Sequence, residues 1–452
     1  MDDKEMNVIS DVYSEEIEKN KGKKSLNKIG PEDQRVENTG NFFLGIATGV
    51  VCTLVVIILG IVVGTLISKK YINTDDKNQL MENAGLNDNV NNQKELLEIM
   101  SKMQYIQQVM DTYYYYDIDM DDIADNVYQG MLEALGDPYS VYYDEEAFAA
   151  LMESTTGTYC GIGVVVSQNI ETMDIVVVNP YEGCPGHKAG LQPGDIILGT
   201  KDVDFAGMDL NEAVSYIKGE EGTKVNIRIL RDGKEMEFQV TREKIDIPTV
   251  AYEKLDGNIA YIAVSSFDAV TYEQFSNAIK EAQADGCQAY IFDLRNNGGG
   301  LYDTVVDMLD DLLPKGKLVY TEDKNGKQEI QYSDAECLDA PMAVLINGNS
   351  ASASEVFAGA MQDYKAAKII GTTSFGKGIV QSIMSLGDGT AVKVTISSYF
   401  TPNGRNIHGQ GITPDITVEL PEDEEAYENG FLKREYDTQL QKAVDYLLTE
   451  LK

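Results

Sequence analysis

Residues 42–68 form an uninterrupted stretch of 27 residues without a charged side chain in this 452-residue sequence. As a helix this stretch would be about 40 Å long, which exceeds the roughly 30 Å hydrocarbon core of a bilayer, and it is too long for a cleaved signal peptide. We therefore predict a single transmembrane helix at 42–68, preceded by a disordered tail at 1–41 and followed by a linker at 69–93. More basic residues precede the helix than follow it, which favours a cytoplasmic tail and an extracytoplasmic remainder at the cell membrane.

Composition excludes several classes of function. The formal net charge of −37 argues against nucleic acid as a partner, because phosphate contacts need a basic surface. The chain has two histidines, His187 and His408, and five cysteines without the spacing of metal ligands. We therefore predict no metal site, no cofactor and no Ser-His-Asp triad.

A serine cluster joins two apolar segments of different character. Residues 342–346 are typical of a buried strand and 356–361 of a helix, and the sequence NSASASE lies between them at 349–355. A serine on such a turn can act as a nucleophile, since the first N–H groups of the helix can hold a developing oxyanion. The spacing of Ser352 and Glu355 also fits a helix capping box, and on the cluster alone capping is the favoured interpretation.

A glycine-rich turn follows 25 residues after Ser352, where residues 371–378 carry a single lysine, Lys377. A lysine can be the general base for a serine if burial lowers its pKa. The same octet nearly matches the phosphate-binding loop G-x-x-x-x-G-K-[ST]. Gly378, however, stands where the Mg²⁺-binding hydroxyl would be, and no helical pattern follows, so nucleotide binding is not predicted.

Upstream, an apolar strand-like segment at 289–294 leads into RNNGGG at 295–300. Consecutive glycines let a backbone approach a substrate closely or turn its N–H groups toward an anion. An ordinary tight turn would use the same residues.

Taken together, the DLRNNGGG, NSASASE and GKGIVQ segments closely resemble, in order and spacing, the carboxyl-terminal processing peptidases. These are membrane-associated or secreted serine proteases with a Ser-Lys dyad. The resemblance implies that Ser352 is the nucleophile, Lys377 the base and Gln381 the residue that orients the lysine. It also implies an oxyanion hole formed by the backbone N–H groups of Gly299 and Ala353.

A helical region is predicted at 94–157. Apolar residues recur at helical spacing over 94–116, and a second helix at 122–135 is stopped by the sequence GDP. The segment YQGMLEALGDPYS at 128–140 resembles the N-terminal helical region of the same peptidases. That region can mediate dimerisation in the family, so a homodimer is one expectation.

Residues 158–245 alternate short strands around one helix at 209–218. With the sequences YCGIG and AGLQPGD, this segment resembles a PDZ domain. Such domains bind a chain terminus as an added strand and hold its carboxylate with backbone N–H groups of a loop. The resemblance implies a peptide groove, although simple core packing would also account for its apolar members: Gly161, Ile162, Gly163, Val164, Val214 and Ile217.

The remainder alternates strands and helices over 246–420, which indicates an α/β core, and the resemblance adds a crotonase-like character to it. An acidic linker and a C-terminal helix are predicted at 421–452. The fold class is thus a multi-domain α/β protein with one N-terminal membrane helix, a helical N-terminal region, a PDZ domain and a Ser-Lys protease core.

The resemblance implies a membrane-anchored serine endopeptidase that recognises the free C-termini of protein substrates through its PDZ domain. Two alternatives come from other classes. One is a catalytically silent PDZ scaffold protein, and the other is the acyl-CoA chemistry of crotonase-like folds, for which a membrane anchor and a peptide-binding domain serve no evident purpose.

Overall fold

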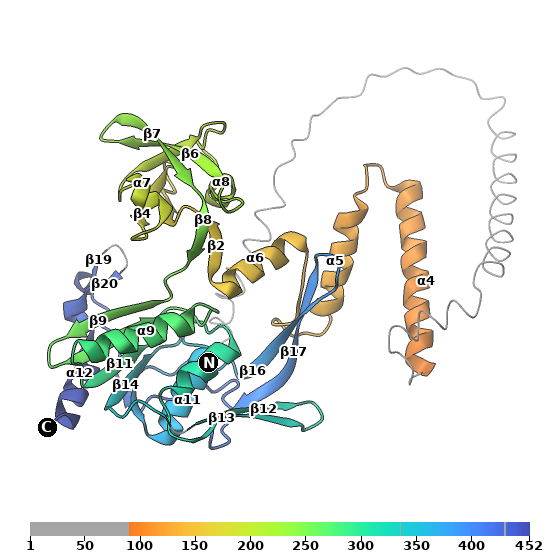
Figure 1. Cartoon of the computed structure of the whole chain (residues 1–452). Helices are drawn as coiled ribbons and strands as arrows, with labels where there is room; N and C mark the ends of the chain where they lie inside the picture. Colours follow the sequence, from red (N-terminus) through yellow and green to blue (C-terminus); the bar gives the residue numbers. More distant parts are fainter. Residues whose placement is uncertain (1–89, 335, 429–430) are drawn as a thin grey trace, which may run out of the picture. The chain divides into compact units, whose positions relative to one another are not determined.

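The structure is a computed structural model that describes residues 90–452 apart from 335, 429 and 430. The predicted tail, the membrane helix and most of the linker lie outside the described residues. Within the described part, no helix has the length and apolar character needed to cross a bilayer. The chain divides into two units, one of which contains helix α4 (Val90–Tyr113) and the other of which begins at Asp119 (Figure 1). Helix α4 agrees with the amphipathic helix predicted at 94–116.

The second unit opens with two helices that flank a short strand. Helix α5 (Met120–Glu133) and helix α6 (Glu145–Thr156) begin at aspartates whose carboxylates accept backbone N–H groups, Asp119 and Asp144 respectively. Between them, β1 (Val141–Tyr143) pairs with a strand of the peptidase core. The predicted helical region at 94–157 thus also contains a three-residue strand, which is too short to show a strand pattern in the sequence.

A small five-stranded antiparallel sheet with the order β3-β4-β5-β6-β7 forms the PDZ-like domain. Its strands are β3 (Val164–Gln168), β4 (Ile175–Pro180), β5 (Ile196–Thr200), β6 (Lys224–Arg231) and β7 (Lys234–Thr241), with helices α7 (Pro185–Ala189) and α8 (Leu210–Ile217). The chain enters on β2 (Thr158–Gly161) and leaves on β8 (Glu243–Asp246), and these two strands pair with each other. Beside the outermost residues of that pair, Thr158 and Asp246, the Ile247 N–H donates to the Gly157 carbonyl at 2.8 Å.

The peptidase core is built on a six-stranded sheet with the order β18-β15-β14-β11-β10-β9. β9 runs antiparallel to β10, and the other neighbouring strands of this sheet are parallel. The strands are β9 (Val250–Leu255), β10 (Ile259–Val264), β11 (Ala289–Asp293), β14 (Met342–Ile346), β15 (Ala367–Gly371) and β18 (Ile416–Thr417). Strands β11 and β14 are buried at every position, since helices cover both faces of the sheet.

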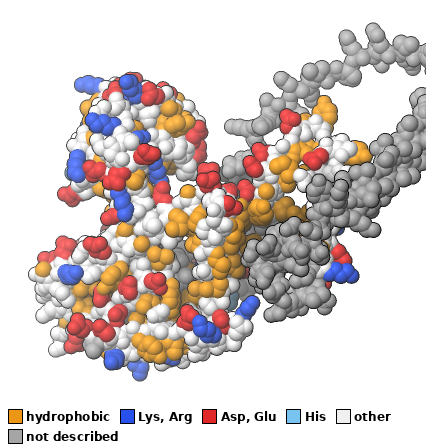
Figure 2. Space-filling model, turned by 45° about the vertical axis from the view of Figure 1, so that its right-hand side comes forward, with side chains coloured by type: hydrophobic (Ala, Val, Ile, Leu, Met, Phe, Trp, Pro, Cys, Tyr) orange, Lys and Arg blue, Asp and Glu red, His pale blue; other side chains and the backbone are white. Residues whose placement is uncertain are grey.

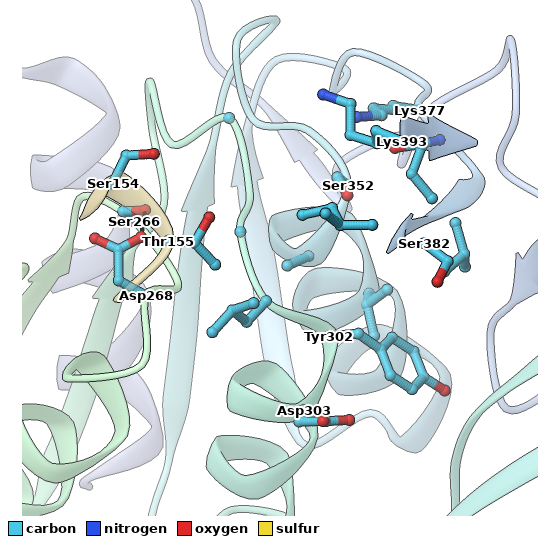
Figure 3. A pocket seen from close by; sticks show the side chains of 18 of the residues that line it. Ser154, Thr155, Ser266, Asp268, Tyr302, Asp303, Ser352, Lys377, Ser382 and Lys393 are labelled. Atoms are coloured by element: carbon cyan, nitrogen blue, oxygen red, sulfur yellow. Dashed lines mark hydrogen bonds between the residues drawn. The ribbon is translucent and has the colours of Figure 1, made fainter. Parts of the chain in front are cut away.

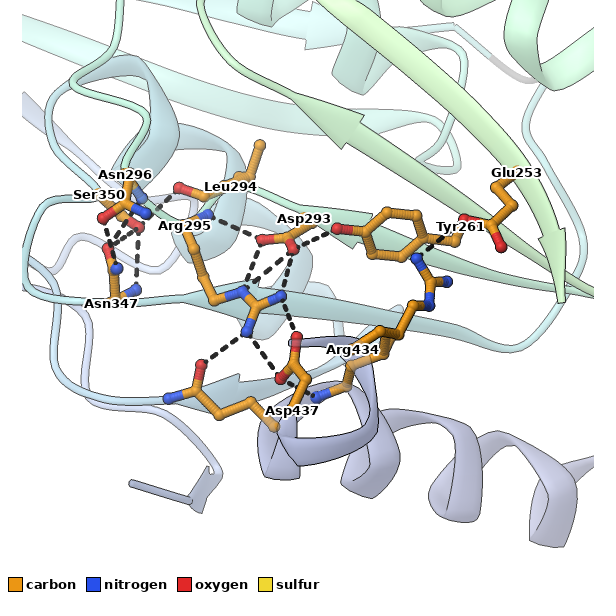
Figure 4. Close-up of polar contacts among 12 residues, drawn as sticks. Glu253, Tyr261, Asp293, Leu294, Arg295, Asn296, Asn347, Ser350, Arg434 and Asp437 are labelled. Atoms are coloured by element: carbon orange, nitrogen blue, oxygen red, sulfur yellow. Dashed lines mark hydrogen bonds and ion pairs between the residues drawn. The ribbon is translucent and has the colours of Figure 1, made fainter. Parts of the chain in front are cut away.

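Side chains that alternate along the strands pack against different helices. One face contacts α9 (Thr271–Ala284), α10 (Tyr302–Asp310) and α11 (Ala353–Tyr364). The other face contacts α12 (Thr438–Glu450), which confirms the predicted C-terminal helix. Helix α12 is also held by Arg295, whose buried guanidinium donates to Asp293 and to Asp437 (Figure 4). The segment from 421 onward further contains η1 (Glu424–Ala426), β19 (Tyr427–Glu428), β20 (Phe431–Leu432) and η2 (Arg434–Tyr436).

A second sheet completes the core around the long strand β17 (Ala391–Phe400). β1 and β12 (Gly316–Asp323) pair with β17 at its two ends, β13 (Gln328–Ser333) pairs with β12, and β16 (Ile379–Ser385) pairs along the other edge of β17. Within the described chain, β16 has no strand on its outer edge. This arrangement places the glycine-rich turn of Lys377 directly before an edge strand.

Candidate active site

Ser352 lies on the turn between β14 and α11 in a strained backbone conformation, with φ +55° and ψ −115°. Residues with a side chain rarely adopt positive φ, and where they do the strain tends to mark a functional site. The N–H of Glu355 donates to the Ser352 backbone carbonyl at 2.8 Å, and Ser352 is the N-cap residue of α11 in a capping box with Glu355. The Ser352 side chain also lines a cavity of about 750 Å³.

The two neighbouring serines have structural hydrogen bonds. The Ser350 hydroxyl donates to the Leu294 carbonyl at 2.7 Å, and the Ser354 hydroxyl donates to the Asn297 carbonyl at 2.8 Å. Both serines are completely buried. Ser352 is therefore the member of the cluster that faces the cavity, in agreement with the choice that the sequence resemblance implied.

Glu355 joins the serine turn to the lysine turn. Its buried carboxylate accepts the Ser352 N–H at 2.9 Å and the Lys377 N–H at 2.8 Å on one oxygen. The other oxygen accepts the Ser374 hydroxyl at 2.5 Å and the Gly376 N–H at 2.7 Å. The capping box thus accounts for the contact between Glu355 and Ser352. The contacts of Glu355 with the lysine turn could not be recognised in the local sequence.

Lys377 and Ser352 lie on the wall of the same cavity (Figure 3). Burial lowers the pKa of the Lys377 amine below its usual range, and the positive charge of Lys393 acts in the same direction. The carboxylates of Asp137 and Glu355 oppose this shift without reversing it. A depressed pKa makes the neutral amine available as a proton acceptor.

Gln381 lies on β16 and lines the same cavity. Its side-chain amide donates to the Thr395 hydroxyl at 3.3 Å. Among the described residues it makes no hydrogen bond to Lys377, so its role in orienting the lysine stays a prediction.

The two predicted oxyanion donors are neighbours in space. A Cβ added to Gly299, where φ is +109°, would lie 2.8 Å from the Cβ of Ser352 and 3.0 Å from the Ala353 nitrogen, so this close approach requires glycine. The Ala353 N–H stands at the start of α11, where a helix offers no internal acceptor. The Gly299 N–H donates to the Asn297 side chain at 2.8 Å and would have to exchange that bond in order to hold an oxyanion.

Tyr399 on β17 provides a second link between nucleophile and base that the sequence did not indicate. Its hydroxyl hydrogen is shared between the carbonyl of Ser352, at 3.0 Å, and the carbonyl of Lys377. Burial and the charge of Glu355 raise the pKa of Tyr399 well above its usual range. The phenol therefore stays a neutral donor at any working pH.

The proposed PDZ groove is also present as a cavity, of about 200 Å³. Gly161, Ile162, Val164, Val214 and Ile217 line it, whereas Gly163 does not. Ile162 and Ile217 are at the same time part of the buried core of the domain, so packing and groove formation share these residues. Tyr159 and Lys218 line the cavity as well and were not predicted.

A strained serine at a helix start and a half-buried lysine with a lowered pKa line one cavity of an α/β core, an arrangement that suits a serine peptidase. The chain belongs to peptidase family S41. The family model described as "Peptidase family S41" matches residues 258–418, a "PDZ domain" matches 176–231, and the "Activating protease CtpB N-terminal domain" matches 61–147.

The relatives carry similar descriptions. A "Probable CtpA-like serine protease" of Staphylococcus epidermidis is 36% identical over 344 residues, which cover 75% of this chain and 68% of the relative. A protein of the same description from Staphylococcus aureus is 35% identical over 326 residues, covering 71% and 65%. The chain thus spans about two thirds of the length of these relatives. The solved photosystem II D1 C-terminal processing protease is 30% identical, with 70% of this chain and 88% of that chain covered and a TM-score of 0.42.

Proposed function

We propose that this chain is a membrane-anchored serine endopeptidase that recognises protein C-termini through its PDZ domain and hydrolyses peptide bonds with a Ser352–Lys377 dyad. The observation that carries the proposal is the common cavity of the two side chains. Ser352 has a strained backbone at the start of α11, and burial lowers the pKa of the Lys377 amine, which favours its neutral form.

The chemistry follows from these positions. The neutral Lys377 amine takes the hydroxyl proton as Ser352 Oγ attacks the substrate carbonyl carbon, and the resulting ammonium gives that proton to the leaving amine. The N–H groups of Ala353 and, after release from Asn297, Gly299 stabilise the oxyanion. A water molecule deprotonated by the same amine then hydrolyses the acyl-enzyme and restores Ser352.

The outer edge of β16 supports an extended polypeptide as the substrate. Residues 379–383 of this strand line the cavity, and an open edge can pair with an incoming strand through main-chain hydrogen bonds that do not depend on sequence. Apolar side chains gather on and beside this strand and β17 (Figure 2): Ile383, Met384, Leu386 and Ile396. An unfolded, apolar chain segment fits this surface.

The membrane location rests on the uncharged stretch at 42–68, which lies outside the described residues. In the proposal this stretch anchors the protein in the cell membrane, with the tail in the cytoplasm and the catalytic part outside it. Association into a homodimer through the N-terminal helical region belongs to the same proposal.

The decisive experiment combines a fluorophosphonate probe with fragment mapping. We expect the full-length protein to be labelled on Ser352 and to cut an unfolded protein such as reduced casein into fragments that mass spectrometry identifies. Labelling and cleavage should both vanish in Ser352→Ala and in Lys377→Met. A PDZ scaffold without catalytic activity would show neither labelling nor cleavage in the unmodified chain.

A further inference from the structure

The turn at residues 137–140 lies beside the candidate base, although more than two hundred residues separate them in sequence. The amine nitrogen of Lys377 stands 4.5 Å from the centroid of the Tyr139 ring. The turn precedes β1, whose pairing with β17 fixes its place on the core, with Val141 opposite Lys393. The sequence GDPYS at 136–140, which includes the turn, belongs to the segment that resembles the N-terminal helical region of the family. Neither that resemblance nor the proposed function assigns the turn a role in the site.

A chain of hydrogen bonds connects this turn to Gln381. The Gln381 amide donates to the Thr395 hydroxyl at 3.3 Å, and that hydroxyl donates to the Asp137 carboxylate at 2.7 Å. The same carboxylate oxygen accepts the Ser140 hydroxyl at 2.7 Å, and Ser140 Oγ in turn accepts the Thr395 N–H at 3.1 Å. Thr395 is therefore held by two residues of the turn, and it holds Gln381.

We propose that the 137–140 turn is a positioning element of the peptidase site, in which the Tyr139 ring holds the Lys377 amine and Asp137, through Thr395, holds the Gln381 amide. The inference rests on the proposed function, because it assigns these residues to the action of Lys377 as a base. Tyr139 and Asp137 are positioning residues, since neither needs to touch the substrate.

The ring has a physical reason to matter in this reaction. A lysine side chain has four rotatable bonds between Cα and Cε. Without a contact that holds it, the amine of Lys377 would seldom point at Ser352. An aromatic face attracts an ammonium group above it, and Lys377 becomes an ammonium when it takes the serine proton. The Tyr139 ring thus favours the protonated state that forms during the attack and holds the amine in one place.

The charge of Asp137 acts on the same amine. Burial and Lys393 favour the neutral amine of Lys377, while Asp137 favours the ammonium. The Lys393 amine is itself held by the Tyr143 hydroxyl at 2.6 Å. Among the described residues, titratable groups near Lys377 come from the turn, α11 and β17: Asp137, Tyr139, Glu355, Lys393, and Tyr399 with its bond to the Lys377 carbonyl. Burial raises the pKa of Tyr139, so its ring is uncharged.

The test measures kcat and KM of the full-length protein on fluorescein-labelled casein from about pH 5 to about pH 10, together with the rate of fluorophosphonate labelling. Tyr139→Leu should lower kcat and the labelling rate about tenfold with KM nearly unchanged. Tyr139→Phe keeps the ring face and should restore both rates. A matched control is Tyr142→Leu on β1, since the Tyr142 hydroxyl bonds to Asp125 and Tyr142 is not among the described residues that line the cavity.

Two further variants separate charge from position. Asp137→Asn preserves size and removes the negative charge, so the ionisation that limits activity should move to lower pH. Thr395→Val interrupts the connection to Gln381 while leaving the charge of Asp137 in place. It should lower kcat and leave that ionisation where it is in the wild type.

Wild-type kcat in Tyr139→Leu, an unshifted profile in Asp137→Asn, or an equal loss in Tyr142→Leu would overturn the positioning role. Should Tyr139→Leu fail to fold by circular dichroism, the Asp137 and Thr395 variants still decide the question. Ser352→Ala is measured in parallel. An active Ser352→Ala would refute the proposed function itself, whereas an inactive one with unaffected turn variants refutes the turn alone.

Discussion

The carboxylate of Glu355 accepts the backbone N–H of Lys377 at 2.8 Å, across 22 residues of sequence. One buried side chain on α11 therefore sets the spacing between the turn that carries the candidate nucleophile and the turn that carries the candidate base. The backbone of each turn depends on the other, because the Ser352 N–H binds the same oxygen.

Glu355→Gln should lower the free energy of unfolding by about 2–4 kcal/mol. The NH2 of the glutamine amide replaces one carboxylate oxygen, and it would then face two N–H or O–H donors. Urea denaturation measures this loss. Glu281→Gln, an exposed glutamate of α9, is the matched control and should change stability by less than about 0.5 kcal/mol. A similarly small change in Glu355→Gln would contradict the role of this carboxylate.

The serine cluster gives a graded prediction. Ser352→Ala should abolish cleavage and cost only about 1 kcal/mol of stability, the usual effect of losing an N-cap side chain. Ser350→Ala and Ser354→Ala should each cost about 1–2 kcal/mol of stability through a lost buried hydrogen bond and still cleave. Equal inactivation by Ser350→Ala in folded protein would show that the wrong oxygen had been chosen.

The Lys377 pKa leads to a prediction on pH. At its usual pKa of about 10.4, only about one lysine in 2,500 is neutral at pH 7, so the lowered pKa should make cleavage rise with pH through one ionisation below that value. Lys377→Arg should be inactive because a guanidinium keeps its proton. Replacement of His187 and His408 by glutamine should leave the profile unchanged, and loss of the ionisation in that double variant would refute the lysine as base.

The same pKa affects stability. Because the folded pKa of Lys377 lies below the unfolded one, the folded protein binds fewer protons between the two values, and stability rises with pH there. The cost of this lysine is present in full below the folded pKa and disappears above the unfolded pKa of about 10.4. Lys377→Met should therefore unfold at higher urea than the wild type at pH 7, and the difference should shrink on the way to pH 10.

Capture of a C-terminus can be tested on the substrate. Amidation of the C-terminus of a test peptide removes the carboxylate that the loop at 161–164 would bind through its N–H groups. Cleavage of the amidated peptide should be slower at low concentration, and Val214→Glu on α8 should remove the difference between the two peptides. Equal rates for free and amidated peptides across all concentrations would rule out this mode of recognition, while the hydrolytic site would be unaffected.

Much of the core could be predicted because its signals are local. The apolar runs that became β11 and β14 each occupy a few consecutive residues and were correctly interpreted as strands. Helix α5 was predicted in the same way, and the sequence GDP terminates it as expected. The glycines at 298–300 and the serine cluster are equally local signals, and their catalytic interpretation stays a prediction.

What the sequence could not show depends on contacts between distant segments. Tyr139, Thr395 and Tyr399 have ordinary neighbours in sequence and acquire their place only when β17 brings them to Lys377. The contact of Arg295 with Asp437 spans 142 residues, and β1 is too short to show any period. Gly299 lies beside Ser352 and Ala353, and its role as an oxyanion donor stays a prediction. The bond from its N–H to Asn297 could not be foreseen.

The paired entry and exit strands of the PDZ-like domain have a consequence for how the chain is assembled. Because the Gly157 carbonyl and the Ile247 nitrogen are only 2.8 Å apart, excision of the residues between them would leave two ends that a very short bridge could join. The domain is thus inserted at a single point of the chain, between two backbone groups that already contact each other. Its exchange or loss, in evolution or by engineering, would require only a short connection between residues 157 and 247.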